Sequence, residues 1–351
     1  MAKSLIYDLD FQFLAAIFKD WGQPSYRAKQ LWEGLYQQLW SRPEDFSTFP
    51  NDLRQNLADE FDFSHLHEAE RLFSKDGQTT KVLFILPDGQ PIETVLMRYD
   101  ERNTLCISTQ AGCAMGCVFC ATGQMGFRRN LTSGEIVEQV LFFARQLKAE
   151  GERVTNVVLM GMGEPFHNYD ATLAAIDCLG NPDGFNMGAR RFTISTVGLI
   201  PAIKRFTSER RQIGLAISLH AAEDDLRSSM LPVNQRFPVK DLIQACREYV
   251  DVTGRRITFE WALIQNVNDS PEEARRLAEL LHGLNGHVNV IPLNPTRGYN
   301  GERSTRERVS GFRDILESHS ISCTVRVRRG IDIQAGCGQL AEPVATVKSS
   351  A

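Results

Sequence analysis

The sequence predicts an α/β protein in which six strand-helix units form a parallel sheet that curls into a partial barrel. A small helical domain and a β-hairpin linker precede it. From residue 104 onward, short apolar runs rich in β-branched residues alternate with helical stretches, which is typical of a parallel sheet. Of the 351 residues, 42% are hydrophobic and 23% are charged, as in an ordinary folded globular protein.

Residues 1–75 are predicted to form the helical accessory domain. Aromatic and leucine side chains recur at helical spacing in RAKQLWEGLYQQLW and LRQNLADEF. This segment holds eight basic and twelve acidic residues, so it accounts for the whole formal net charge of −4. The remainder of the chain is balanced and can present a local basic face, which a nucleic-acid partner requires.

Residues 76–100 are expected to form the hairpin linker, because KVLFILPDGQPIETVLMRYD has two β-rich runs around a Pro-Asp-Gly turn. The core domain is predicted over residues 101–340, and residues 341–351 are expected to be a tail. The clearest core helix begins at Thr132, where Thr-Ser-Gly-Glu is a capping box. The predicted core strands are 104–108, 154–160, 191–196, 213–219, 256–264 and 288–293.

The location of the protein is expected to be cytoplasmic, without a membrane. The N-terminus carries Asp8, Asp10 and Asp20 around a short apolar stretch and has no small-residue cleavage site. No apolar run approaches the roughly 20 residues that span a bilayer. Eight cysteines in a chain too large to need a disulfide scaffold indicate a reducing compartment, where cysteine serves metal binding or catalysis.

Three cysteines, Cys113, Cys117 and Cys120, are spaced C-x3-C-x2-C directly after the first core strand. A structural zinc site or a ferredoxin cluster needs a fourth ligand, and no suitable residue follows within twenty positions. Chance clustering is disfavoured because glycines beside the cysteines let the backbone wrap closely. The fourth interpretation is a 4Fe-4S cluster held by three thiolates, with one iron open to a substrate or cofactor.

Four of the other strands are followed by short motifs that contain a polar group. The motif residues are Gly163, Glu164, Ser195, Ser218, Leu219, His220 and Asn294. Because the carboxyl ends of parallel strands meet at one rim, we expect these residues to lie together there. For any one of them, an ordinary strand-terminal cap is the alternative.

The cysteine motif, with Phe119 before its last cysteine, resembles the radical S-adenosylmethionine (SAM) superfamily, and further phrases resemble its RlmN/Cfr family of RNA methyltransferases. The resemblance covers almost the whole chain, including the accessory domain at YRAKQLWEGLY. It implies a 4Fe-4S cluster on Cys113, Cys117 and Cys120, and SAM bound by the strand-end residues. The phrases are LCISTQAGCAMGCVFCATGQMGFRRNL, VVLMGMGEP, LAISLHA, PVN, VNDS, IPLNP and GCGQLA.

The resemblance is greater to the RlmN branch, which implies methylation of carbon 2 of adenine in 23S ribosomal RNA and in transfer RNA, with two SAM molecules per turnover. Cys337 corresponds to the cysteine that carries the methyl group, and the glycines beside it favour a flexible, accessible thiol. Cys106 corresponds to a cysteine that releases the product through a transient disulfide. Glu93 corresponds to a proton acceptor. From the residues alone, Cys106 is typical of a buried strand and Glu93 of a solvated position.

The expected partners are these RNAs and an electron donor such as flavodoxin or ferredoxin, and the protein is expected to be a monomer. RNA affinity should come from arginine contacts to phosphate. The last three candidates are favoured because they lie near Cys337 in the sequence. The candidates are Arg128, Arg129, Arg190, Arg191, Arg210, Arg211, Arg326, Arg328 and Arg329.

Three other functions remain open. A Cfr-like carbon 8 methyltransferase of 23S ribosomal RNA, which confers antibiotic resistance, shares the cluster and cysteine motifs. A radical SAM enzyme that acts on a small molecule or a protein would not require both Cys106 and Cys337. A non-enzymatic iron-sulfur or zinc protein would hold a fully ligated metal.

Overall fold

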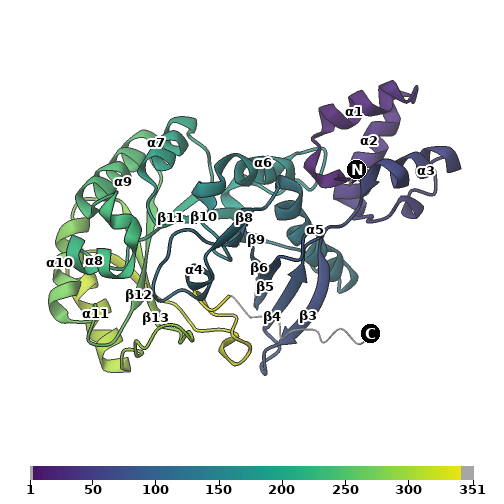
Figure 1. Cartoon of the computed structure of the whole chain (residues 1–351). Helices are drawn as coiled ribbons and strands as arrows, with labels where there is room; N and C mark the ends of the chain where they lie inside the picture. Colours follow the sequence, from purple (N-terminus) through teal and green to yellow (C-terminus); the bar gives the residue numbers. More distant parts are fainter. Residues whose placement is uncertain (1–2, 341–351) are drawn as a thin grey trace.

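A mixed sheet of ten strands organises the protein (Figure 1), in the order β14-β13-β12-β11-β10-β9-β6-β5-β4-β3. The computed structural model describes residues 3–340, so the predicted tail at 341–351 lies outside the described residues. The parallel strands are β6 (Arg102–Cys106), β9 (Asn156–Leu159), β10 (Phe192–Thr196), β11 (Gly214–Ser218), β12 (Ile257–Leu263), β13 (Gly286–Pro292) and β14 (Ser322–Val325). The antiparallel edge consists of β3 (His67–Phe73), β4 (Thr79–Ile85) and β5 (Pro91–Tyr99).

The six core strands predicted from the sequence are confirmed, and β14 adds a seventh parallel strand. β14 pairs with β13, with Val288 opposite Cys323. Its four residues, SCTV, alternate between exposed and half-buried positions, so they lack the buried apolar run that identifies the other parallel strands. The consequence is functional, because Arg326 follows β14 directly and therefore comes to the carboxyl rim of the sheet.

Helices alternate with the parallel strands, and α7, α9, α10 and α11 lie along the outer side of the curved sheet (Figure 1). The short helix α4 (Ala121–Met125) and the end of the described chain lie inside the curve. The alternating helices are α5 (Ser133–Ala149), α6 (Tyr169–Gly180), α7 (Ile200–Glu209), α8 (Asp224–Met230), α9 (Val239–Thr253), α10 (Pro271–Leu281) and α11 (Arg306–Ser318).

Helix α5 begins at the predicted capping box. The Thr132 side chain accepts a hydrogen bond from the Glu135 amide, and the Glu135 carboxylate accepts one from the Thr132 amide at 3.0 Å. A cap of this kind stabilises a helix by about 1 kcal/mol. The same first turn also holds the N-terminal segment, because the Gly134 amide donates to Asp8 Oδ1 at 2.7 Å.

The N-terminal helices are α1 (Phe11–Asp20), α2 (Ser25–Glu33) and α3 (Asn51–Glu60), with a π-helical turn at Gly34–Gln38. The helical prediction is therefore confirmed for most of this segment, but it is wrong for His67–Phe73, which forms β3. This strand lies at the sheet edge, and its charged, mostly exposed residues hide the alternation expected of a strand. Two short strands, β1 (Ser4–Leu5) and β2 (Phe61–Asp62), pair beside the helices.

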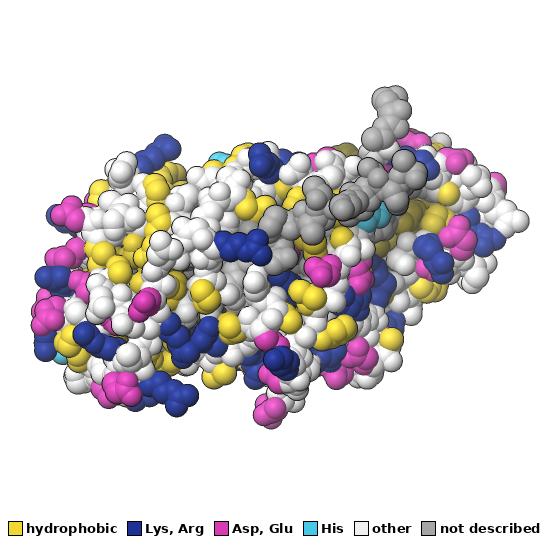
Figure 2. All heavy atoms as spheres, turned by 60° about the horizontal axis from the view of Figure 1, so that its bottom comes forward, with side chains coloured by type: hydrophobic (Ala, Val, Ile, Leu, Met, Phe, Trp, Pro, Cys, Tyr) yellow, Lys and Arg dark blue, Asp and Glu magenta, His cyan; other side chains and the backbone are white. Residues whose placement is uncertain are grey.

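The predicted hairpin is confirmed as β4 and β5. The turn between them closes through the Leu86 amide, which donates to the Gln90 carbonyl at 2.9 Å, and Gly89 adopts φ +79°. In the part of the chain that the structure describes, no helix combines the length and apolar character needed to cross a bilayer. Figure 2 shows one face of the molecule, on which Lys and Arg side chains lie singly and in small groups among acidic and uncharged ones.

Candidate active site

The three clustered cysteines lie on one tight loop between β7 (Gln110–Gly112) and α4. β7 pairs with β8 (Phe127–Asn130), which returns from the loop. Gly112 adopts φ +72°, and a Cβ there would lie 1.9 Å from the Gly126 carbonyl oxygen. A Cβ on Gly123 would lie 3.0 Å from both the nitrogen and the oxygen of Cys117. The glycines therefore let the loop close on itself, as the sequence predicts.

The thiols of Cys113, Cys117 and Cys120 line a common cavity inside the curve of the sheet. Burial raises the pKa of Cys113 to about 12 and raises the pKa values of the other two thiols. Positive charge from iron would reverse this preference, because a metal deprotonates the thiols that bind it. These sulfurs are thus suited to a metal cluster and poorly suited to free thiolate chemistry.

A single metal ion does not fit this loop. Among residues 3–340, no three Cys, His, Asp or Glu side chains converge closely enough to hold one ion together. In a 4Fe-4S cluster each cysteine binds a different iron, so its ligands need not converge on one point. The donor set of three cysteines therefore fits such a cluster and disfavours a structural zinc site.

The cavity is lined by side chains of the cysteine loop and of the carboxyl ends of the strands. Six of the seven strand-end residues predicted for this rim line it together with the cysteines. They are Gly163, Glu164, Ser195, Ser218, His220 and Asn294.

Leu219 is the predicted strand-end residue that does not line the cavity. Its side chain is fully buried in the hydrophobic core. The neighbours Ser218 and His220 face the cavity, and alternation along an extended chain sends Leu219 to the opposite side. Its carbonyl instead accepts a hydrogen bond from Arg227 Nε at 3.0 Å.

The glycines of the GMGEP turn are required by close packing. A Cβ on Gly161 would lie 2.6 Å from the Ile107 carbonyl oxygen. Gly163 adopts φ +103°, and a Cβ there would lie 2.6 Å from Gln110 Cβ. Gln110 also fixes the next residue, because its Oε1 accepts from the Glu164 amide at 2.8 Å. The turn after β9 is thereby set against the end of β6 and the start of the cysteine loop.

Glu164 places a carboxylate in the wall of the cavity. The side chain is 2% exposed, and its oxygens accept hydrogen bonds from the amides of Phe166 and Val197, each at 2.9 Å. Burial raises the pKa of Glu164 to about 7, against the effect of these hydrogen bonds. A bound cation such as an ammonium group would favour the ionised form. The residue can therefore recognise a positively charged part of a ligand.

His220 is a neutral, oriented imidazole. Its Nδ1 accepts a hydrogen bond from the Ala262 amide at 2.9 Å, so the proton of the neutral ring lies on Nε2. Burial and the nearby Arg227 lower the pKa of His220 to about 3. The ring meets Phe119 edge to face at 5.0 Å between centroids. The aromatic residue of the cysteine motif is thus packed against the end of β11.

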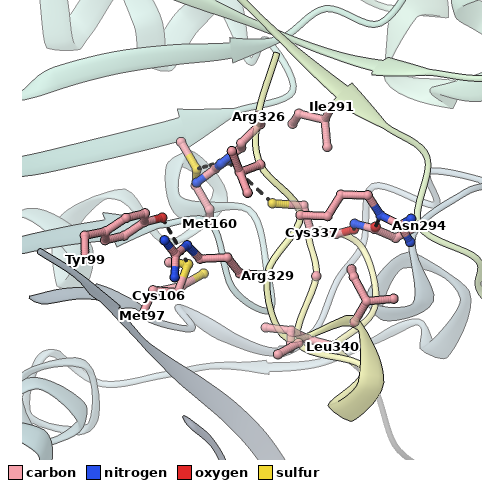
Figure 3. A pocket seen from close by; sticks show the side chains of 15 residues that line it. Met97, Tyr99, Cys106, Met160, Ile291, Asn294, Arg326, Arg329, Cys337 and Leu340 are labelled. Atoms are coloured by element: carbon pink, nitrogen blue, oxygen red, sulfur yellow. Dashed lines mark hydrogen bonds between the residues drawn. The ribbon is translucent and has the colours of Figure 1, made fainter. Parts of the chain in front are cut away.

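Cys337 lies where this cavity meets a second one. It lines both cavities, whereas Cys106 lines only the second. Figure 3 shows that Cys106, Cys337 and Arg326 point into this second cavity. Arg326 Nη1 lies 3.6 Å from Cys337 Sγ and 4.0 Å from a carboxylate oxygen of the buried Glu260. All eight cysteines of the chain are free thiols, so Cys106 and Cys337 are not bonded to each other.

Cys106 and Cys337, the two cysteines of the second cavity, differ in their exposure to solvent. Cys337 is exposed, whereas Cys106 is half-buried. Burial and the neighbouring Cys337 raise the pKa of Cys106 to about 12, and Arg326 opposes this shift. The pKa of Arg326 is raised above its usual value, chiefly by Cys337. Sequence reasoning treats Arg326 only as an RNA contact and misses its position beside both thiols.

The segment that carries Cys337 is accessible but fixed. Asn294 Nδ2 donates to the Cys337 carbonyl at 3.1 Å, and the Ala121 amide donates to the Gly338 carbonyl at 2.7 Å. A Cβ on Gly336 would lie 2.6 Å from Asn294 Nδ2, and Gly338 adopts φ +81°. The prediction of an accessible thiol is confirmed, but the glycines allow close packing and do not leave the backbone loose.

Glu93 lies outside both cavities. Its side chain is 1% exposed, so the expectation of a solvated residue is wrong. The carboxylate forms an ion pair with Lys81 Nζ at 2.9 Å. Lys81 also approaches the Cys337 segment, with Nζ 3.4 Å from the Gln334 carbonyl oxygen. The ion pair therefore lies beneath the segment that carries the exposed thiol.

Arg227 is a buried residue of the site that sequence reasoning misses. Its guanidinium donates to the carbonyls of Val197 at 2.6 Å and Ser218 at 3.2 Å, and to Asn234 Oδ1 at 2.9 Å. The sequence signal is the PVN phrase, which contains Asn234. Arg227 joins the ends of β10 and β11 and so fixes the rim around the cavity.

The arginines that were candidates for RNA contacts separate into distinct regions. Arg190 and Arg191 directly precede β10, and Arg210 and Arg211 precede the start of β11, so all four lie at the amino ends of strands, away from the rim that carries the cavities. Arg129, on β8, pairs with Glu135 and Asp88, and Arg128 lies beside it on the same strand. Arg326, Arg328 and Arg329 line the second cavity beside Cys337.

Comparison with known proteins identifies the family. The Radical SAM superfamily matches residues 107–286. The dual-specificity RNA methyltransferase RlmN 1 of Myxococcus xanthus is 50% identical, over 95% of this chain and 93% of the relative. The chain belongs to the RlmN family of radical SAM methyltransferases. Another RlmN relative, the ribosomal RNA large subunit methyltransferase N of Nitrosopumilus maritimus, is 47% identical over 92% of this chain and 93% of its own length.

The RlmN fold is also represented by a solved structure. The crystal structure of a radical SAM methyltransferase from Sphaerobacter thermophilus matches with a TM-score of 0.94 and 49% identity, over 96% of this chain and 99% of that one. Radical SAM enzymes use a 4Fe-4S cluster and SAM. In this RlmN chain, the loop with Cys113, Cys117 and Cys120 fits the cluster, and the cavity beside the loop fits SAM.

Proposed function

We propose that the protein methylates carbon 2 of an adenosine in 23S ribosomal RNA, and of adenosine in transfer RNA, through an S-methylcysteine at Cys337. The observation that supports this most directly is the position of Cys337, which lines both the cavity beside the cysteine loop and the cavity of Cys106. A thiol at this junction can accept a carbon unit on one side and deliver it on the other. The relatives are named as RNA methyltransferases.

The substrate explains why radical chemistry is needed. Carbon 2 of adenine is electron-poor, so it does not attack the methyl group of SAM as an amine would. Cys113, Cys117 and Cys120 would hold the cluster, and the polar rim residues, Glu164 among them, would orient SAM. Together the cluster and SAM supply an electron and a 5′-deoxyadenosyl radical.

The residues of the chain then have distinct roles. Cys337 accepts a methyl group from a first SAM, as the bond from that methyl group to the sulfonium breaks and the thiol proton is lost, with the guanidinium of Arg326 3.6 Å from its sulfur. The S-methyl group gives a hydrogen atom to the 5′-deoxyadenosyl radical, and its carbon bonds to carbon 2. The adduct then gives up one electron to the redox partner and the proton of carbon 2 to a base. Cys106 attacks the sulfur of Cys337 and breaks its bond to the methylene carbon, which takes up a proton and leaves as the methyl group of the base, so that a transient disulfide remains for later reduction. A flavodoxin or ferredoxin is the proposed electron donor.

The proton on carbon 2 must leave during this sequence. Glu93 is the proposed acceptor, and Cys106 contributes from the cavity itself. Because Glu93 pairs with Lys81 outside the cavity, its role requires either opening of that ion pair or relay of the proton through solvent.

The test uses protein with an anaerobically reconstituted cluster, methyl-labelled SAM and an unmodified 23S ribosomal RNA transcript. We expect label on RNA with wild type and with Cys323→Ala, a control cysteine on β14, and none with Cys337→Ala. Cys106→Ala should accumulate a covalent protein-RNA adduct. Mass spectrometry of the nucleosides should identify 2-methyladenosine. Labelled RNA from Cys337→Ala would contradict the role of that thiol, and 8-methyladenosine would establish the carbon 8 reaction instead.

A further inference from the structure

An open groove lies beside the second cavity, between the start of α11 and the segment after β14. Its charged lining consists of Arg303, Arg306, Arg313, Arg326 and Arg328, and no acidic side chain of the described residues lines it. Such a concentration of arginine is unusual in a chain whose overall charge is −4. The groove therefore has a local charge opposite in sign to that of the whole molecule.

Two of the five arginines are partly neutralised. Arg313 pairs with Asp314 at 2.8 Å, and Arg326 lies 4.0 Å from Glu260. Within residues 3–340, no carboxylate lies within salt-bridge distance of Arg303, Arg306 or Arg328. Arg328 Nε donates a hydrogen bond to Asn294 Oδ1 at 3.0 Å, and Arg306 acts electrostatically on the adjacent Glu307, but none of the three is held in an ion pair with a described residue, so each can meet an external anion.

The free arginines also repel one another. Burial and the nearby Arg303 lower the pKa of Arg328, so the two guanidinium groups lie close enough to interact unfavourably. Arg306 is the first residue of α11, whose N-terminal amides add positive potential on the same side. An anion in the groove would remove this repulsion, and a chain of phosphates would do so along its length.

The groove is continuous with the cavity of the two catalytic thiols. Arg326, Val327, Arg328 and Ile331 line both. Val327 is 76% exposed, which leaves an apolar surface between the thiol cavity and the arginines. If one base of a nucleic-acid strand lies in the cavity, the part of the strand that leaves the cavity contacts first the apolar Val327 and then the arginines. This order suits a nucleic acid, in which apolar base and sugar groups alternate with phosphates.

We propose that this groove binds the phosphate backbone of the RNA strand on one side of the methylated adenosine, chiefly through Arg303, Arg306 and Arg328. The inference depends on the proposed RNA methyltransferase function and adds the path of the substrate. Arginine suits this role because its planar guanidinium can donate two hydrogen bonds to one phosphate.

The experiment measures binding of an unmodified transfer RNA transcript to the full chain by fluorescence anisotropy at several salt concentrations. It compares wild type with the double variant Arg303→Ala/Arg306→Ala. Each lost phosphate contact reduces the slope of log K against log salt by about 0.7 to 0.9, so the slope should become shallower by about 1.5. Affinity near physiological salt should fall at least about tenfold.

Two controls make the result specific. Arg190→Ala/Arg191→Ala removes the same charge at the amino ends of the strands and should leave the slope unchanged. Arg303→Lys/Arg306→Lys keeps the charge and should recover most of the slope. Thermal unfolding of each variant checks the fold.

The possible outcomes distinguish a failure of the groove inference from a failure of the proposed function. If wild type binds the RNA and both alanine pairs change the slope equally, or neither changes it, the groove is not the path of the backbone, although the methyltransferase proposal stands. If wild type neither binds nor methylates RNA, the proposed function itself fails, and the groove inference fails with it.

Discussion

At the scale of single residues, the site depends on titratable groups whose surroundings differ sharply. Glu164 is buried among backbone donors, His220 is held neutral, and Cys337 lies beside the guanidinium of Arg326. Of these, Glu164 has the clearest dependence on pH. Burial raises its pKa to about 7, well above that of an unfolded glutamate.

The contribution of Glu164 to the stability of the cluster-free protein should therefore fall as pH rises from about 4.5 to 7, whereas the lowered pKa of His220 gives a contribution that rises up to about pH 6.5. In this range the folded state holds a proton on Glu164 that the unfolded state has released, so the contribution is full at low pH and is lost as pH passes the folded pKa. The loss should be about 3 kcal/mol. Glu164→Gln cannot titrate at this position and keeps His220, so the stability of wild type relative to the variant, measured by urea denaturation, should fall between pH 5 and 7.5. A stability difference between the two proteins that does not change with pH would refute this role for Glu164.

At the scale of elements, strand ends and glycine turns determine where the side chains meet. The cysteine loop, the GMGEP turn and the segment around Gly336 each contain a glycine whose Cβ would clash with neighbouring atoms. The sequence shows these glycines, but it does not show which contact each one permits. For Gly161 that contact is with the backbone of Ile107, which cannot move aside as a flexible side chain can.

Gly161→Ala should therefore destabilise the protein by more than about 1 kcal/mol and weaken SAM binding, since the turn after β9 must shift. Gly311→Ala is the matched control. Gly311 lies within α11 with nothing within 4 Å of its added Cβ, so this change should stabilise the protein by about 0.5–1 kcal/mol. Denaturant titration and isothermal calorimetry with SAM measure the two effects. An unaffected Gly161→Ala protein would show that the turn is not constrained.

The order of the sheet explains which elements could be predicted. Six parallel strands were predictable because each contains a short run of apolar residues in which at least alternate side chains are buried. β14 and β3 were not, because each lies at an edge of the sheet and has a partly exposed, polar sequence. An edge strand is positioned by pairing with a neighbouring strand, and this pairing cannot be read from the residues of the edge strand itself.

At the scale of the whole molecule, residues that are far apart in the sequence, from Cys113 to Cys337, meet at one rim. The rim positions of Glu164, Ser195 and Asn294 follow from the sequence because all lie at or shortly beyond the carboxyl ends of apolar strands. Three other features do not: the burial of Glu93 against Lys81, the core position of Leu219, and the approach of Arg326 to Cys337. Each depends on pairing or packing between segments that are distant in the sequence.

Closure of this rim depends on Asn294, which contacts the Cys337 carbonyl and accepts from Arg328 Nε at 3.0 Å. Asn294→Ala should loosen the segment from 328 to 340 while leaving the barrel intact. Hydrogen exchange followed by mass spectrometry should be at least about tenfold faster there, corresponding to the loss of roughly 1.4 kcal/mol of local stability, and unchanged in α9. Unchanged exchange at 328–340 would mean that other contacts suffice to hold the segment.

Two hydrogen bonds fix the segment that carries Cys337, and they are accepted by the main-chain carbonyls of Cys337 and Gly338. Neither of these two anchors uses the sulfur atom. In the proposed mechanism, the thiol can therefore gain a carbon substituent without breaking either of these two hydrogen bonds. The chemistry on the sulfur and the fixing of the peptide use different atoms of the same residue.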